Sequence, residues 1–178
     1  MQQNDYPMHV NLITPSQHDS LVELLRELHT YYNEGSAVPR ELVHAYLTDH
    51  LLAPDSSLRL VVASDDEHGV IGFAAIFLTY SLVDPAPEKR RQCGLKELYV
   101  REGHRSGGAG RALMTWVAQY AVQQGCSRID WPVKDTNLRG RAFYESLGGR
   151  RVAERLAYRL AEPELSSLAR EGAGAVSR

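Results

Sequence analysis

The stretch that decides the fold is LKELYVREGHRSGGAGRAL, residues 95–113. Its first six residues predict a β-strand, and an apolar stripe through Ala109, Leu113 and Trp116 predicts an amphipathic helix. Three glycines lie at the junction, where they let the backbone turn tightly and let a ligand approach closely. The first N–H groups of a helix are unpaired and its dipole is positive there. This junction therefore favours an anion such as a pyrophosphate.

Several phosphate-binding motifs compete for this loop. A P-loop ends in Gly-Lys-Ser/Thr, and the corresponding residues here are GRA, which excludes it. A dinucleotide-binding fingerprint would place Asp130 suitably downstream, but Leu113 stands where its third glycine is needed and the chain is short for that fold. The third pattern, Arg-x-x-Gly-x-Gly, is matched by Arg105, Gly108 and Gly110. On local chemistry alone, a plain strand-to-helix turn is equally compatible with the sequence.

Composition limits the class of protein. The chain has 178 residues, 43% hydrophobic and 24% charged, which suits one globular domain and excludes disordered, collagen-like and coiled-coil proteins. Its 20 basic and 22 acidic side chains give a formal net charge of -2. A nucleic-acid-binding protein usually carries a basic surface, so we expect no nucleic-acid partner.

Targeting and metal-binding signals are absent from the sequence. The strongly apolar residues 70–78 are far fewer than the ~20 that a membrane-spanning helix needs, and MQQNDYPMHV does not resemble a secretory signal. The 2 cysteines, Cys93 and Cys126, cannot form a disulfide framework, which favours a cytoplasmic setting. None of the 7 histidines shows the spacing of a zinc site, so we expect no metal and no membrane partner.

The order of the expected elements follows from hydrophobic periodicity and turn residues. Ser16 and Asp19 read as the capping box of the first long helix. The expected strands are residues 9–13, 58–63, 70–78, 95–100, 128–133 and one or two within 151–160; the expected helices begin near residues 17, 39, 109 and 138. Residues 162–178, rich in alanine, glycine and serine, are predicted to form a flexible tail.

Three motifs at this spacing resemble the GNAT superfamily of N-acetyltransferases. They are LKELYV at residues 95–100, HRSGGAGRALM at residues 104–114, and NLRGRAFYESLG at residues 137–148. The resemblance covers residues 8–160. It implies a mixed α/β fold, with a twisted, mostly antiparallel sheet, a parallel splayed pair of strands and flanking helices. We expect one N-acetyltransferase domain over residues 1–161.

The resemblance also implies acetyl-CoA as the co-substrate. Its pyrophosphate would bind the backbone amides of the glycine loop, its pantetheine arm would pair with the strand before that loop, and an asparagine and a phenylalanine would contact the same arm. The residues to which the resemblance assigns these contacts are Leu98, Tyr99, Val100, Arg105, Ser106, Gly107, Gly108, Ala109, Gly110, Arg111, Asn137 and Phe143.

Two side chains are candidates for catalysis. Tyr144 occupies the position at which many family members place the acid that protonates the leaving thiolate, and Glu97 is our candidate to accept the amine proton. Tyr144 could instead be a core aromatic, and Glu97 could be a strand carboxylate paired with an arginine. In a regular strand Glu97 shares a face with Leu95 and Tyr99, but a β-bulge would change that face. Where spermidine/spermine acetyltransferases have two acids, this chain has Lys96 and Glu97, which argues against a polyamine acceptor.

The function implied is transfer of an acetyl group from acetyl-CoA to a primary amine of a small molecule or peptide, by direct attack in a ternary complex. The alternative is a non-catalytic acyl-CoA-binding sensor of the same fold. Residues 31–38 and 82–92 are the expected walls of the acceptor site. A homodimer paired through the terminal strands is compatible with this order of elements.

Overall fold

The computed structural model describes residues 7–173. Its contacts divide the chain into two compact units, Met1–Lys134 and Asp135–Arg178, and each is described by itself. A single domain over residues 1–161 stays a prediction. Among residues 7–173, every helix falls short of the length and apolar character that crossing a bilayer requires.

A five-stranded sheet forms the centre of the first unit. The strands lie in chain order: β1 (His9–Leu12), β2 (Leu58–Asp65), β3 (Gly69–Tyr80), β4 (Arg91–Val100) and β5 (Cys126–Asp130). The first three pairs of neighbours are antiparallel, and β4 with β5 is parallel. This confirms the predicted mixed sheet with one parallel pair. It excludes the doubly wound dinucleotide fold, whose sheet is mostly parallel.

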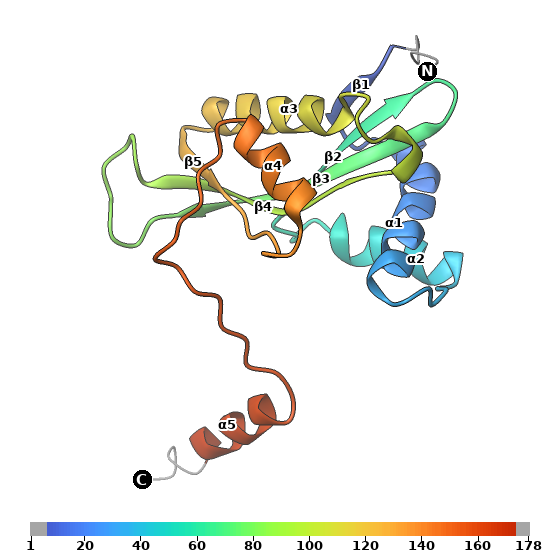
Figure 1. Ribbon diagram of the computed structural model, residues 1–178. Helices are drawn as coiled ribbons and strands as arrows, with labels where there is room; N and C mark the ends of the chain where they lie inside the picture. The colour runs from blue at the N-terminus through green and yellow to red at the C-terminus, as the bar shows by residue number, and fades with distance from the viewer. Residues whose placement is uncertain (1–6, 174–178) are drawn as a thin grey trace. The chain divides into compact units, whose positions relative to one another are not determined.

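Helices cover both faces of this sheet. Figure 1 shows α3 (Ala109–Gln123) along one face, and α1 (His18–Tyr32) with α2 (Arg40–Tyr46) on the other. Phe73 and Ala75 of β3 share one buried cluster with Leu24 of α1. A Cβ at Gly72, on the opposite face, would meet Leu113 of α3 at 3.3 Å. Side chains of β3 are buried on both faces of the sheet, so this strand lies in the core of the unit.

The start of α1 differs from the expectation. The predicted capping box of Ser16 and Asp19 is wrong: the box is formed by Thr14 and Gln17, one turn of 3₁₀ helix earlier. The N–H of Thr14 donates to Gln17 Oε1 at 3.0 Å. Two features of the sequence favour the earlier start: Pro15 suits the first position of a helical turn, and glutamine reaches back to the cap where the shorter Asp19 does not.

A β-bulge interrupts β4 at Lys96. Ala75 of β3 pairs with Glu97, whereas the next residue, Ile76, pairs with Leu95, so Lys96 has no counterpart in the ladder. The bulge turns Leu95 and Glu97 toward opposite faces, although a regular strand would place them on one face. Leu95 is buried, and Glu97 lies on the α1 face, where Tyr32 contacts it.

The parallel pair of strands is short. Its register runs from Arg91 opposite Cys126 to Gly94 opposite Asp130 and ends there. Within the described residues, positions 95–100 of β4 therefore have no strand on that edge, and β5 ends at Asp130 instead of the predicted residue 133. Burial follows this geometry, because Cys93 is 1% exposed while residues 97–100 are only partly buried.

The second unit contains the helices α4 (Leu138–Ser146) and α5 (Glu164–Ala173). The terminal strands predicted within residues 151–160 are wrong, because this segment has neither helix nor strand. An unpaired strand is not stable alone, and none of the described residues after position 134 offers an edge within this unit. The described part of the predicted tail contains α5, and the flexibility of residues 162–178 stays a prediction. A homodimer stays a prediction, but the described residues do not form the terminal strands through which it would pair.

The close contact between Gly94 and the ring of Phe77 generates a stability prediction. A Cβ at Gly94 would clash with Phe77 Cζ, so Gly94→Ala forces the ring to move. We expect this overpacking to lower the free energy of unfolding by about 1–3 kcal/mol, measured by urea denaturation. In a Phe77→Ala background the same change should cost much less. Equal costs in the two backgrounds would contradict the contact.

Candidate functional site

The glycine loop lies at the N-terminus of α3. Ser106 and Gly108 have left-handed backbones, with φ of 69° and 91°, and α3 begins directly afterwards at Ala109. Gly108 is the N-cap residue and has no side chain with which to cover the first amides of the helix. Residues 106–108 are exposed. Exposed amides at a helix N-terminus suit an anion, and binding of a pyrophosphate at this loop stays a prediction.

The open edge of β4 leads into this loop. The N–H of Arg101 donates to Ile71 O on β3 at 2.8 Å. In an antiparallel ladder the main-chain N–H and C=O groups of successive residues point alternately to the two sides of the strand. Those of Leu98 and Val100 therefore point away from β3, to the edge with which β5 no longer pairs. An extended ligand can pair with such an edge as an added strand.

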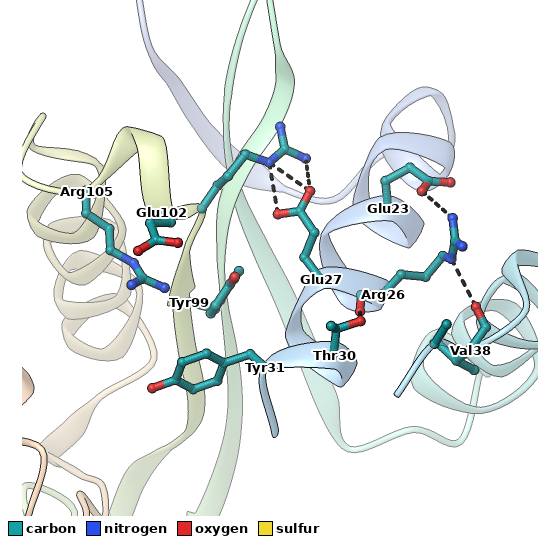
Figure 2. A pocket seen from close by; sticks show the side chains of 11 residues that line it. Glu23, Arg26, Glu27, Thr30, Tyr31, Val38, Tyr99, Glu102 and Arg105 are labelled. Carbon is teal, nitrogen blue, oxygen red and sulfur yellow. Dashed lines mark hydrogen bonds and ion pairs between the residues drawn. The ribbon is translucent and has the colours of Figure 1, made fainter. Parts of the chain in front are cut away.

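Arg105 already contacts this edge. Its Nε donates to Val100 O at 2.9 Å, and its guanidinium lies 5.6 Å from the centre of the Tyr99 ring. Figure 2 shows the Arg105 side chain extended toward Tyr99. Arg105, which the sequence predicts to bind the pyrophosphate, is therefore hydrogen-bonded to Val100 O, a carbonyl that we expect to pair with the pantetheine arm.

Glu97 is the central acid of the site. Tyr32 of α1 donates its hydroxyl hydrogen to Glu97 Oε1 at 3.4 Å, and the side-chain partner of this carboxylate among the described residues is thus a tyrosine, not an arginine. Burial raises the pKa of Glu97, while the backbone N–H of Leu98 and the Tyr32 hydroxyl partly oppose the change. Burial and the charge of Glu97 also raise the pKa of Tyr32. A half-buried carboxylate with a raised pKa suits a proton acceptor.

A pocket of about 540 Å³ lies between α1 and the end of β4, and Figure 2 shows its walls. It is lined by Glu23, Arg26, Glu27, Thr30, Tyr31, Ala37, Val38, Tyr99, Arg101, Glu102 and Arg105. Both signs of charge are present and largely paired: Arg101 binds Glu27 through two hydrogen bonds of 3.1 Å from Nε. The predicted wall at residues 31–38 takes part in this pocket. Its lining includes no residue of the predicted wall at 82–92.

The remaining predicted residues lie in the second unit. Asn137 is the N-cap of α4, and its Oδ1 accepts a hydrogen bond from the N–H of Gly140 at 2.9 Å. The rings of Phe143 and Tyr144 are 5.3 Å apart, and both side chains are half-buried. Tyr144 is therefore not a fully buried core residue of its unit. The cofactor and catalytic roles of these three residues stay predictions.

Sequence reasoning missed Tyr32. The available signal was the pair of tyrosines, Tyr31 and Tyr32, at the end of an amphipathic helix, but nothing in the chain tells which strand that helix end meets. The cysteines offer no alternative nucleophile. Burial, with Cys126 nearby, raises the pKa of Cys93 to about 11, so that its thiol stays protonated at neutral pH.

Comparison with known proteins gives one family and several relatives. A model of the acetyltransferase (GNAT) family matches residues 19–149. An L-ornithine N5-acetyltransferase of Arabidopsis thaliana is 34% identical over 79 residues, which are 44% of this chain and 33% of that protein. A thialysine N-epsilon-acetyltransferase of Bos taurus is 31% identical over 85 residues, which are 48% of this chain and 47% of that protein. The matched stretch thus spans less than half of each of these relatives.

Among solved structures, an integron cassette protein of V. cholerae is similar along almost its whole length. The two superpose with a TM-score of 0.81 and 28% sequence identity, over 91% of this chain and 97% of that one. The arrangement of strands and helices described above is therefore shared with a solved protein.

The raised pKa of Glu97 predicts a pH dependence of stability. Burial lifts the folded-state pKa of Glu97 above the unfolded-state value of about 4.3. The protonated carboxyl group therefore contributes stability that is fully present below the unfolded-state pKa. This stability is lost as pH rises through the folded-state pKa. Glu97→Gln has no charge to bury and avoids this loss. We expect its free energy of unfolding, measured by urea denaturation at each pH, to gain on that of the parent as pH rises from about 4 through the folded-state pKa.

The control is Glu88→Gln, which changes an exposed carboxylate in the loop between β3 and β4. Its stability should follow that of the parent at every pH. A difference between Glu97→Gln and the parent that stays constant with pH would show that the Glu97 carboxyl is not perturbed.

Proposed function

The chain belongs to the acetyltransferase (GNAT) family, and from this premise we propose that it transfers an acetyl group from acetyl-CoA to a primary amine. One observation carries the proposal: the open edge of β4 leads directly into a glycine loop at the N-terminus of α3. The edge suits the amides of a pantetheine arm, and the loop suits a pyrophosphate. In acetyl-CoA the pantetheine arm is joined directly to the pyrophosphate, just as the edge of β4 is followed directly by the loop.

The co-substrate would be held mainly by backbone groups. Leu98 and Val100 would provide the main-chain groups of the pairing edge, with Tyr99 between them, and the amides of residues 106–111 would receive the pyrophosphate. Arg105 would release the carbonyl of Val100 when the arm pairs, and its guanidinium would then be free to bind phosphate as a charge-assisted donor. Asn137 and Phe143 are proposed to contact the same arm. Acetyl-CoA supplies a thioester, whose acyl carbon is open to attack by an amine.

Glu97 is proposed to receive the proton of the amine. Only a neutral amine has the lone pair needed for attack, so a base must take a proton before or during formation of the N–C bond. The raised pKa of Glu97 brings its basicity closer to neutral pH. Tyr32, through its hydroxyl group, would keep the carboxylate oriented.

Tyr144 is proposed to give a proton to the departing sulfur. As the N–C bond forms and the C–S bond breaks, negative charge collects on sulfur. The ordinary pKa values are about 10 for a phenol and about 8.5 for a thiol, close enough for the phenol to donate as that charge develops. The products are then an acetylated amine and free CoA, with one proton held by Glu97 and one supplied by Tyr144.

The proposed acceptor is a primary amine at the end of a short chain. The two curated relatives are named as acetyltransferases of ornithine at N5 and of thialysine at N-epsilon, which supports this class. The pocket beside Tyr99 has the room and the mixed charge to receive an acceptor that itself carries both signs of charge. The alternative, an acyl-CoA sensor without turnover, shares the co-substrate site but needs no acceptor.

An amine-panel assay tests the proposal. Acetyl-CoA is mixed with ornithine, lysine, spermidine or a peptide with a free N-terminus, and the released CoA thiol is followed. We expect release above the amine-free rate with an amino acid that ends in an amine, and little with spermidine. Binding of acetyl-CoA in calorimetry without thiol release from any amine would support the sensor. Failure to bind acetyl-CoA would overturn both.

Gly108 tests the assignment of the loop. Gly108→Leu places a side chain where we expect the pyrophosphate, and should raise the KM for acetyl-CoA about 10–100-fold, the equivalent of one lost charge-assisted hydrogen bond. The matched control is Gly125→Leu, since Gly125 follows the other end of α3 and also has a positive φ and open space around it. Equal values of KM in the two variants would show that the loop does not bind the co-substrate.

Tyr144→Phe tests the proposed acid. The variant keeps the ring and loses one hydroxyl, so the affinity for acetyl-CoA should survive while kcat falls about 10²–10⁴-fold. Because the lost contact forms only as sulfur departs, kcat and kcat/KM should fall together. Tyr158→Phe, in an exposed tyrosine of the same unit, should leave both unchanged. A Tyr144→Phe enzyme with the parental kcat under conditions where chemistry limits the rate would remove Tyr144 from the mechanism.

A further inference from the structure

Three side chains with metal-binding atoms meet outside the proposed acetyl-transfer site. Asp65 ends β2, His68 lies in the turn between β2 and β3, and His104 ends the short 3₁₀ helix η3 (Glu102–His104). Each offers one ligand atom, and these atoms all lie within 4.8 Å of one another. Asp65 and His68 are three residues apart, and the fold brings His104, a distant residue in the sequence, to them.

The spacing of the first pair fits a tetrahedral ion. His68 Nδ1 lies 3.1 Å from Asp65 Oδ1 and 3.3 Å from Asp65 Oδ2. Two ligands bonded to Zn²⁺ at about 2.0–2.1 Å with tetrahedral angles lie about 3.3–3.4 Å apart. This pair therefore has nearly the separation that a shared ion requires, and His104 would complete the set through a small movement of its ring.

His104 carries an unmet hydrogen-bonding group. Its Nδ1 is buried and has no hydrogen-bond partner among the described residues. A buried polar atom without a partner is unfavourable, so a ligand that pairs with it is favoured. The ring of His104 meets that of His68 edge to face, with centroids 4.6 Å apart. Two imidazoles and a carboxylate are thus held together around one point.

We propose that Asp65, His68 and His104 form a binding site for a divalent transition metal ion of the zinc class. The donor set of two imidazole nitrogens and one carboxylate oxygen matches Zn²⁺, whereas Mg²⁺ and Ca²⁺ prefer oxygen ligands alone. The His68 side chain is 35% exposed, so the ion has a path from solvent and water can fill its fourth position.

The hydrogen bonds of the turn are compatible with this site. Asp65 Oδ1 accepts from the backbone N–H groups of Glu67 at 3.0 Å and His68 at 2.6 Å. Among the described residues the hydrogen-bond partner of Oδ2 is the His68 ring, so Oδ2 can bind the ion while Oδ1 stabilises the turn. The ion would join the turn between β2 and β3 to η3, directly before Arg105 and the glycine loop.

Titration of the metal-free full-length protein with Zn²⁺ and with Co²⁺ tests the site. Calorimetry should show one Zn²⁺ per chain, and Co²⁺ should give the intense visible absorption of a four-coordinate ion. His68→Gln and His104→Gln should each weaken Zn²⁺ binding about 10-fold or more and remove the Co²⁺ absorption. His50→Gln, an exposed histidine of another segment, should change neither.

Asp65→Asn provides a further variant, because its amide oxygen can still accept the hydrogen bonds of the turn while it is a weaker metal ligand. The thermal midpoint of the parent should rise with added Zn²⁺, and that of His104→Gln should not.

Absence of saturable Zn²⁺ binding by the parent, or equal binding by the parent, His68→Gln and His104→Gln, would overturn the proposal and leave Asp65 and His68 as a hydrogen-bonded pair of the turn. Neither result bears on acetyl transfer, which the thiol-release assay tests separately.

Discussion

The rest of the site depends on the separation of β4 from β5 after Gly94. Up to that residue the two strands pair. Beyond it, one row of main-chain N–H and C=O groups of β4 has lost its strand partner. Unpaired backbone groups need a partner, and in this structure Arg105 supplies one to Val100. Such an open edge suits an extended ligand, and its geometry is fixed by the strands around it. Since α3 connects β4 to β5, its N-terminus necessarily lies beside this edge.

A second constraint is the bulge at Lys96. One extra residue in β4 turns Glu97 to the α1 face, where the Tyr32 hydroxyl meets it, and leaves Leu95 on the opposite, buried face. Without the bulge the carboxylate and the apolar side chain would share a face, and one of them would be misplaced. The same face carries Tyr99 and the charged pocket. The bulge therefore brings together the open edge, the proposed base and the pocket proposed for the acceptor.

Local features of the fold could be predicted from the sequence, whereas features that depend on distant partners could not. The glycine loop, the start of α3 at Ala109 and the order of the strands follow from residues that are neighbours in the chain. The bulge at Lys96 is a property of two paired strands, and the contact of Tyr32 with Glu97 joins residues 65 positions apart. The strands expected within residues 151–160 are the opposite case, because the local sequence predicts strands that do not form. Alternating side chains suggest a strand, but a strand also needs an edge with which to pair.

The most direct test of this account is amide hydrogen exchange with and without CoA. If the open edge and the glycine loop hold the co-substrate, exchange should slow at Leu98, at Val100 and over residues 106–111, while the amides of β1 stay unchanged. Calorimetry on the same sample establishes that CoA is bound. Bound CoA without added protection at these amides, or with protection confined to other strands, would contradict the central claim that the separation of β4 from β5 creates the binding site.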